Sequence, residues 1–150
     1  MPVQIVEVNL QALEEHPDWR ADLEKIYSEA ESLRRSFEDQ ALEAPEFVEA
    51  VLEDQDSWFA GALFNDHLIG AVLVTQSQDS WYLRHLCVRE VTRRRGVGSR
   101  LMALVASSAR AKGLDVWVPG KQLTLADQML VRRLGYTHHP ETGDFLLESA

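Results

Sequence analysis

The sequence predicts an α/β (α+β) domain built on one mixed, mostly antiparallel sheet of six to seven strands flanked by about four helices. Helical spacing of apolar residues dominates the first third and returns twice in the second half, whereas the middle of the chain has the alternation and β-branched runs of strands. The chain has 150 residues, of which 45% are hydrophobic. That is enough for one compact core without a disulfide or metal to hold it. We therefore expect a single domain over residues 1–150.

The first third of the chain is expected to hold one strand and two helices. Residues 3–8 alternate weakly, as a short strand does, and Asn9 ends them. From Asp18, which follows Pro17 and is placed to cap a helix, apolar residues recur at three- and four-residue steps. They are Trp19, Leu23, Ile26, Tyr27, Ala30 and Leu33. A second short helix is expected from Pro45, because proline is favoured in a first helical turn.

An antiparallel meander of three strands is expected in the middle of the chain. Residues 58–64 and 67–75 read as two of its strands. Asn65 and Asp66 separate them, and both tolerate positive φ, so they suit a two-residue hairpin turn. A polar turn then leads to a third strand over residues 81–88.

A strand-helix-strand unit is expected next. The helix ends at Gly113, and the apolar strand that follows, residues 114–120, should lie parallel to the strand before the helix. One face of this helix is formed by Val97, Leu101, Leu104, Val105 and Ser108. A last helix ends at Gly135, and two short strands follow it, residues 136–139 and 144–148. The stripe of the last helix is formed by Leu123, Ala126, Leu130 and Leu134.

The net charge of −9 is unevenly distributed. Residues 1–56 hold 16 acidic and 4 basic residues, a net of −12, whereas residues 84–100 hold six arginines and one glutamate, a net of +5. We expect no nucleic-acid or membrane partner for so acidic a chain, and no apolar run approaches the about 20 residues of a membrane-spanning helix. A single cysteine, Cys87, and an N-terminus without a signal-peptide pattern favour a cytoplasmic protein without a metal site. The basic stretch indicates an anion site.

This basic stretch has the form of a phosphate-binding loop. It places a buried strand, three arginines and two glycines directly before a helix, whose first N–H groups are unpaired and whose dipole favours an anion. Gly96 and Gly98 would let the backbone approach an oxyanion closely. Arg93, Arg94 and Arg95 would grip phosphate oxygens. The P-loop and dinucleotide-binding patterns are not satisfied, because no lysine follows Gly98 and a third glycine is missing.

The loop resembles the arginine-rich G-x-G loop of the GNAT acetyltransferase superfamily. The resemblance covers the chain from about Trp58 to the C-terminus and includes the order of the elements and the Leu-Gly-Tyr of residues 134–136. It implies acetyl-CoA or CoA as the ligand, with the pantetheine arm bound along a strand that holds Leu86, Cys87 and Val88. It implies that the pyrophosphate is bound by Arg93, Arg94, Arg95, Gly96, Val97, Gly98 and Ser99.

Within this superfamily the run VREVTRRRGVG, residues 88–98, is similar to the PanZ family. Members of that family are acetyl-CoA sensors that bind the aspartate decarboxylase proenzyme, promote its self-cleavage and so regulate β-alanine and coenzyme A synthesis. The resemblance implies this proenzyme as a partner and Asn65 as a partner-binding residue. Leu63 and Leu73 stand where the resemblance predicts arginines.

Two functions stay open, a PanZ-like sensor and an N-acetyltransferase that acts on an amine of a small molecule or protein. The acidic first third of the chain would attract a cationic amine. Many GNAT enzymes, however, carry a proton-donating tyrosine four residues before the glycine of the Leu-Gly-Phe motif, and here that position is Val131. Tyr82 and His85 could substitute, and on an alternating strand they should face opposite sides. Tyr136 is expected to pack in the core, no catalytic residue is assigned, and the sensor is favoured.

Overall fold

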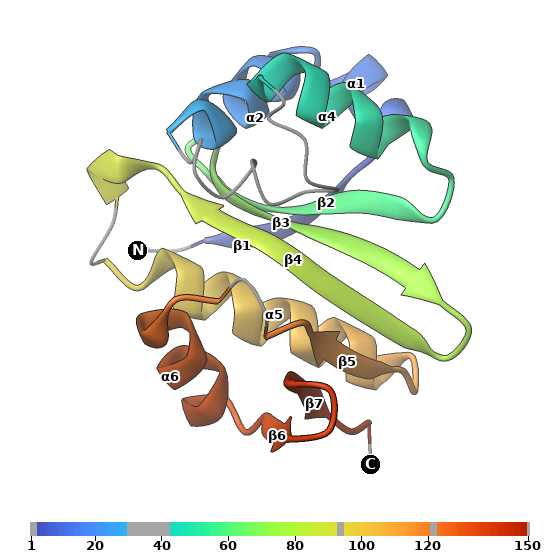
Figure 1. Cartoon of the computed structure of the whole chain (residues 1–150). Helices are drawn as coiled ribbons and strands as arrows, with labels where there is room; N and C mark the ends of the chain where they lie inside the picture. The colour runs from blue at the N-terminus through green and yellow to red at the C-terminus, as the bar shows by residue number, and fades with distance from the viewer. Residues whose placement is uncertain (1–2, 30–42, 93–94, 121–122, 150) are drawn as a thin grey trace.

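A computed structural model of the chain describes residues 3–29, 43–92, 95–120 and 123–149. Within them the strands form one seven-stranded sheet of order β1-β2-β3-β4-β5-β7-β6 (Figure 1). The strands are β1 (Gln4–Val8), β2 (Ser57–Phe64), β3 (His67–Ser77), β4 (Ser80–Val88), β5 (Asp115–Val118), β6 (Thr137–His139) and β7 (Asp144–Leu147). The α-helices are α1 (Leu10–Glu15), α2 (Asp18–Ser28), α4 (Ala44–Glu53), α5 (Val97–Ala111) and α6 (Leu125–Arg133). Of these helices, none has both the length and the apolar character that crossing a membrane requires.

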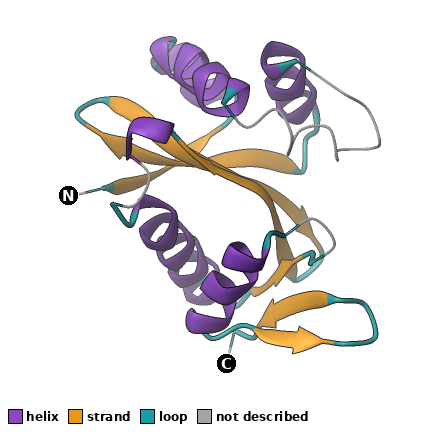
Figure 2. Ribbon diagram, turned by 60° about the vertical axis from the view of Figure 1, so that its left-hand side comes forward, coloured by secondary structure: helices purple, strands orange, loops and turns teal. Residues whose placement is uncertain are grey.

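The pairing of the strands confirms the predicted fold class. β2, β3 and β4 form the antiparallel meander, and β4 pairs in parallel with β5, as expected for a strand-helix-strand unit. The remaining pairs, β1 with β2, β5 with β7 and β6 with β7, are antiparallel. Helices α2 and α4 lie on one face of the sheet, and α5 and α6 lie on the other (Figures 1 and 2).

Each face of the sheet therefore has its own core. The core under α5 and α6 includes Leu83, Leu101 and Phe145, and the core under α2 and α4 is centred on Tyr27, Phe47 and Phe59. The Tyr27 ring centroid lies 4.9 Å from that of Phe47 and 5.4 Å from that of Phe59.

Leu63 and Leu73, where the resemblance predicts arginines, both contact the core under α2 and α4. Leu73 is 1% exposed in this core, and Leu63 packs against it. An arginine at position 73 would bury a charge at a cost of several kcal/mol. Leucine therefore fits position 73 better than arginine.

The hairpin between β2 and β3 has the predicted two-residue turn. Asn65 has φ 52° and Asp66 has φ 67°, and left-handed conformations at both positions define a type I′ turn. Asp22 of α2, which is 7% exposed, anchors the base of the hairpin. Its Oδ2 atom accepts a 3.0 Å hydrogen bond from the Leu68 N–H and lies 3.4 Å from the Nδ1 atom of His67.

The structure corrects the predicted start of the first long helix and adds a helix before it. Helix α1 was not predicted, and the Asn9 side chain caps it by accepting a 2.9 Å hydrogen bond from the Ala12 N–H. Pro17, not Asp18, occupies the N-cap position of α2. Asp18 is instead the first helical residue, where the helix dipole favours an acid. Ala30 and Leu33 lie outside the described residues.

Candidate functional site

Strand β4 contains a bulge at His85. Leu73 of β3 pairs with Arg84 and Ala71 pairs with Cys87, so one residue of β3 lies opposite two residues of β4. His85 has φ 56°, a left-handed conformation that is uncommon for a residue with a side chain. The bulge interrupts the ladder in the middle of the sheet.

The bulge is held from the face that α2 and α4 cover. Tyr27 Oη donates a 2.8 Å hydrogen bond to the backbone carbonyl of His85. The Phe47 ring packs edge-on against the His85 imidazole, with ring centroids 5.3 Å apart. The α2–α4 core therefore fixes the backbone of β4 at the point where the strand bends.

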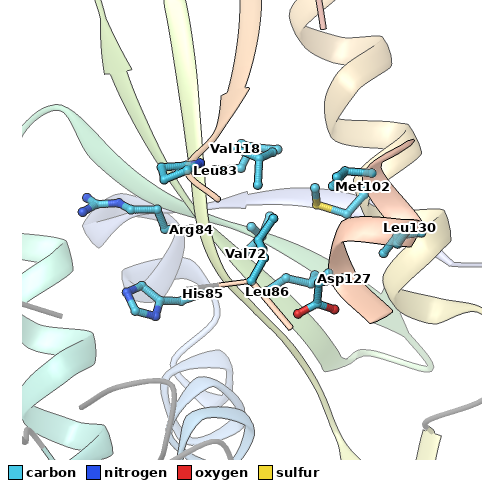
Figure 3. Close-up of a pocket in the computed structure, with 12 residues that line it drawn as sticks. Val72, Leu83, Arg84, His85, Leu86, Met102, Val118, Asp127 and Leu130 are labelled. Atoms are coloured by element: carbon cyan, nitrogen blue, oxygen red, sulfur yellow. The ribbon is translucent and has the colours of Figure 1, made fainter. Parts of the chain in front are cut away.

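The prediction that Tyr82 and His85 face opposite sides is wrong, because the bulge resets the alternation of β4. Leu83 belongs to the core under α5, so its neighbour Tyr82 faces the other side. His85 contacts Phe47 and lies on that same side. Figure 3 shows His85 directed away from Met102 of α5.

A cleft opens between β4 and β5 next to the bulge. The pairing of the two strands runs from Ser80 with Asp115 to Tyr82 with Trp117 and goes no further. Beyond these pairs lies a small cleft that is partly open to solvent. Its apolar wall comes from β4, β5, α5 and α6 and includes Leu83, Leu86, Met102, Val118, Leu130 and Val131 (Figure 3). Such a wall suits an uncharged part of a ligand.

The N-terminus of α5 presents free backbone donors. Gly96 occupies the N-cap position with φ 76°. The first helical hydrogen bond joins the Arg100 N–H to the Gly96 carbonyl at 2.9 Å. Within the described residues, the N–H groups of Val97, Gly98 and Ser99 make no hydrogen bond. Three open N–H groups at a helix N-terminus form a favourable environment for an anion.

The strand and the helix that were predicted to share the ligand meet at Gly98. A Cβ atom on Gly98 would lie 3.5 Å from Val88 Cγ2 and 3.7 Å from Leu86 Cδ2. Leu86 lines the cleft, whereas the Cys87 side chain is 5% exposed in the core under α2 and α4. Val97 is likewise buried, at 3% exposed, so only its backbone is open to a ligand.

The described arginines of the basic stretch have different environments. Arg93 and Arg94 lie outside the described residues, while Arg95 and Arg100 are exposed near the N-terminus of α5. Arg84 points away from the apolar wall (Figure 3). Part of the net charge of +5 of residues 84–100 therefore lies away from the loop.

Arg89 is committed to an ion pair. Its Nε atom lies 3.0 Å from Oε1 of Glu29, just after α2, and the same oxygen accepts the Glu90 N–H at 3.0 Å. This carboxylate ties the segment before the loop to α2. Arg89 therefore has a structural role that the sequence pattern did not reveal.

Few side chains in the cleft can exchange a proton. Val131 lines the cleft and is 2% exposed, and a valine donates no proton. The titratable residues among the described lining are Arg84, His85 and Asp127. Burial, with a smaller contribution from the Arg84 guanidinium, lowers the pKa of His85 to about 4. The imidazole is therefore neutral at pH 7.

Asp127 is the lining residue that sequence reasoning missed. It follows Leu123 by four residues and precedes Leu130 by three, so it stands on the apolar stripe of α6, and this position was the available signal. Ala126, which was predicted on that stripe, is exposed instead. The cleft therefore has one carboxylate in an otherwise apolar α6 wall.

Asn65 lies at the same end of the sheet as the loop. It is exposed in the β2–β3 turn. Gly70, near the start of β3, pairs with Val88, the last residue of β4. The turn thus extends beyond the end of β4 from which the chain continues toward α5.

Comparison with known families and sequences gives a consistent result. A family model described as "Acetyltransferase (GNAT) domain, PanZ" matches residues 7–138. The chain is 46% identical over 74 residues to the PanD regulatory factor of Escherichia coli strain K12, covering 49% of this chain and 57% of that protein. It is 46% identical over 59 residues to the PanD regulatory factor of Salmonella typhimurium, covering 39% and 46%. The chain spans about half the length of the curated relatives it matches.

Solved structures share the fold at low sequence identity. Tetrahymena GCN5 superposes with a TM-score of 0.72 at 14% identity, covering 100% of this chain and 97% of that one. An aminoglycoside 6'-N-acetyltransferase complexed with coenzyme A superposes with a TM-score of 0.65 at 16% identity, covering 98% and 97%. These likenesses show a GNAT fold.

Proposed function

Because the chain belongs to the PanZ family of GNAT acetyltransferase domains, we propose that it is an acetyl-CoA-responsive regulator of the aspartate decarboxylase proenzyme. In this function the chain binds acetyl-CoA or CoA, then binds the proenzyme and promotes its self-cleavage, which feeds pantothenate and coenzyme A synthesis. The curated relatives are named PanD regulatory factors, which supports the choice of partner. A cytoplasmic site of action is part of the proposal.

The observation that carries the proposal is the junction of the apolar cleft with the open N-terminus of α5. The cleft wall suits the pantetheine arm, and the N–H groups of Val97, Gly98 and Ser99 suit the pyrophosphate. Arg95 and Arg100 add exposed cations beside them. The residues present therefore fit coenzyme A, and its acetyl thioester would supply an activated acyl group at the cleft.

A regulator is favoured over a transferase because the cleft has a valine at the position where many GNAT enzymes carry a proton-donating tyrosine. Acetyl transfer needs a base for the amine and a proton for the departing thiolate. Val131 offers neither. His85 borders the cleft, but its imidazole points to the opposite side of β4, against Phe47, and burial lowers its pKa. Asp127 offers a carboxylate, but the proton for the thiolate would still need a donor. These residues favour holding the thioester over consuming it.

An N-acetyltransferase is the second candidate, and one surface supports it. A groove between α2 and α4 is lined by Glu24, Glu46, Glu49 and Glu53, with Arg20 paired to Glu49 at 2.9 Å. Its net negative charge would attract a cationic amine. Acetylation of a broad panel of amines tests this candidate, and rapid turnover of any of them would favour it over the regulator.

Calorimetric titration with acetyl-CoA tests the ligand assignment. We expect the Arg94→Ala and Arg95→Ala variants to weaken binding by about 1 to 3 kcal/mol, the range of charge-assisted hydrogen bonds. The control is Arg133→Ala on the exposed side of α6, which also removes one cation. Unchanged affinity in both loop variants would remove the loop from the site.

A further inference from the structure

The N-terminus of α6 holds a capping motif that is only half formed. Thr124 is the N-cap residue, and its Oγ1 atom accepts a 3.1 Å hydrogen bond from the Asp127 N–H. In a complete capping box the acid three residues after the cap accepts a hydrogen bond from the backbone N–H of the cap. Within the described residues, the Thr124 N–H donates no such hydrogen bond to the Asp127 carboxylate. The Asp127 carboxylate is thus not used to cap the helix.

The Asp127 carboxylate lines the cleft instead. It extends from α6 toward β4, beside apolar side chains such as Leu86 and Leu130 (Figure 3). Among the residues that the structure describes, it has neither a hydrogen bond nor an ion pair. The α6 dipole favours an acid in the first turn, but it gives the carboxylate oxygens no donor. A half-buried carboxylate that lines a cleft is open to a donor group on a ligand.

We propose that Asp127 is the residue through which the cleft recognises the pantetheine arm, by accepting a hydrogen bond from one of its amide N–H groups. The identity of the ligand rests on the proposed function. The arm carries two secondary amides, and the apolar wall offers them no other side-chain acceptor from α6. Asp127 therefore selects for an arm with amide donors, separately from the loop that binds the pyrophosphate.

The proposal predicts the opposite change in CoA affinity to the one that charge repulsion alone predicts. Coenzyme A is a polyanion, so a carboxylate near its path opposes binding by charge repulsion alone. Removing such a carboxylate would tighten binding if no hydrogen bond were formed. Weaker binding after its removal therefore requires a favourable contact that outweighs the repulsion.

Titration calorimetry with two probes tests the proposal. The probes are CoA and adenosine 3',5'-bisphosphate, which lacks the pantetheine arm. The test variants are Asp127→Ala and Asp127→Asn. The control variant is Glu141→Gln in the exposed β6–β7 turn, which also removes one negative charge. Asn keeps an oxygen acceptor and a similar shape, so it separates the hydrogen bond from a packing effect.

We expect Asp127→Ala to weaken CoA binding about tenfold, which is about 1.4 kcal/mol, and Asp127→Asn to weaken it less. The affinity for the bisphosphate should stay within twofold of wild type in both Asp127 variants. Glu141→Gln should change the affinity for neither probe. Unchanged or tighter CoA binding by Asp127→Ala, or an equal loss for both probes, would overturn the inference. If the wild-type chain bound neither probe, the proposed function itself would fail, together with this inference.

Discussion

Tyr27 donates its hydroxyl hydrogen to the backbone carbonyl of His85 at 2.8 Å, joining α2 to the bulge of β4. The cleft lies on the other side of that strand, where Leu83 and Leu86 form part of its wall. The conformation of β4 at the cleft therefore depends on a side chain from the opposite layer. A change in the core under α2 and α4 should reach the ligand site through this strand.

The two buried tyrosines should respond in opposite ways to loss of their hydroxyl groups. Tyr27→Phe removes the hydrogen bond to His85 and should lower the free energy of unfolding by about 1 to 2 kcal/mol. Tyr136 Oη is buried and has no hydrogen-bond partner among the described residues. Tyr136→Phe should therefore leave stability unchanged or raise it by up to about 1 kcal/mol. Urea denaturation measures both, and equal losses would contradict this assignment.

His85 should make stability depend on pH. Burial, with a smaller effect of Arg84, lowers its pKa from 6.5 to about 4 in the folded chain. Between these values the unfolded chain binds a proton that the folded chain does not, so the unfolding free energy falls as the pH falls. It should be constant above about pH 6.5 and lose up to about 3 kcal/mol by pH 4.

The control for this pH dependence is His85→Asn, because asparagine tolerates the positive φ of this position and does not titrate. Urea denaturation of both proteins between pH 4.5 and 7.5 compares their slopes. The variant should show a flatter dependence. The same slope in both proteins would mean that His85 does not carry the effect.

The β2–β3 hairpin could be predicted from sequence, whereas the bulge of β4 could not. The turn at Asn65 and Asp66 depends on the conformational preferences of two adjacent residues. The bulge at His85 is held by Tyr27, which lies 58 residues earlier in the chain, and by Phe47. Such tertiary contacts leave no periodic signal in β4 itself, so strict alternation wrongly predicted that Tyr82 and His85 face opposite sides.

The candidate site was predictable to a similar extent. The loop and its helix follow from local signals such as Gly96, whose positive φ ends the loop and begins α5. Charge counting, however, does not reveal that Arg89 is paired with Glu29 across the fold. It also does not reveal that Asp127 lies in the cleft, because its position on the α6 face becomes significant only when β4 lies opposite.

Alanine substitutions at Gly96 and Gly98 should have different effects, the first on stability and the second on CoA binding. Gly96→Ala forces a side chain into φ 76° and should cost about 1 to 2 kcal/mol of stability. Gly98→Ala places its Cβ at ordinary contact distance from Val88, and alanine favours the helix, so stability should hold or rise by up to about 1 kcal/mol. Its methyl group would narrow the junction of α5 with β4, and we expect CoA affinity to fall at least tenfold. Thermal melts and calorimetry check the pair, and wild-type affinity in Gly98→Ala would count against this junction as the pyrophosphate site.

Asn65 should contribute to partner binding without contributing to coenzyme binding. Glycine accommodates the φ of 52°, so Asn65→Gly deletes the side chain and keeps the turn. We expect this variant to bind the proenzyme at least tenfold more weakly and acetyl-CoA normally. Asp66→Gly, in the same turn, is the matched control. Equal proenzyme binding by both variants and the wild type would exclude Asn65 from the interface.

The most direct measurement of the central claim is the rate at which the aspartate decarboxylase proenzyme of the same organism cleaves itself. Purified proenzyme is incubated alone, with this chain, with acetyl-CoA, and with both, and the two product chains are followed over time by gel electrophoresis. Cleavage should accelerate when the chain and acetyl-CoA are both present, and the proenzyme should co-purify with the chain under that condition. A cleavage rate that the chain leaves unchanged at every acetyl-CoA concentration would contradict the account.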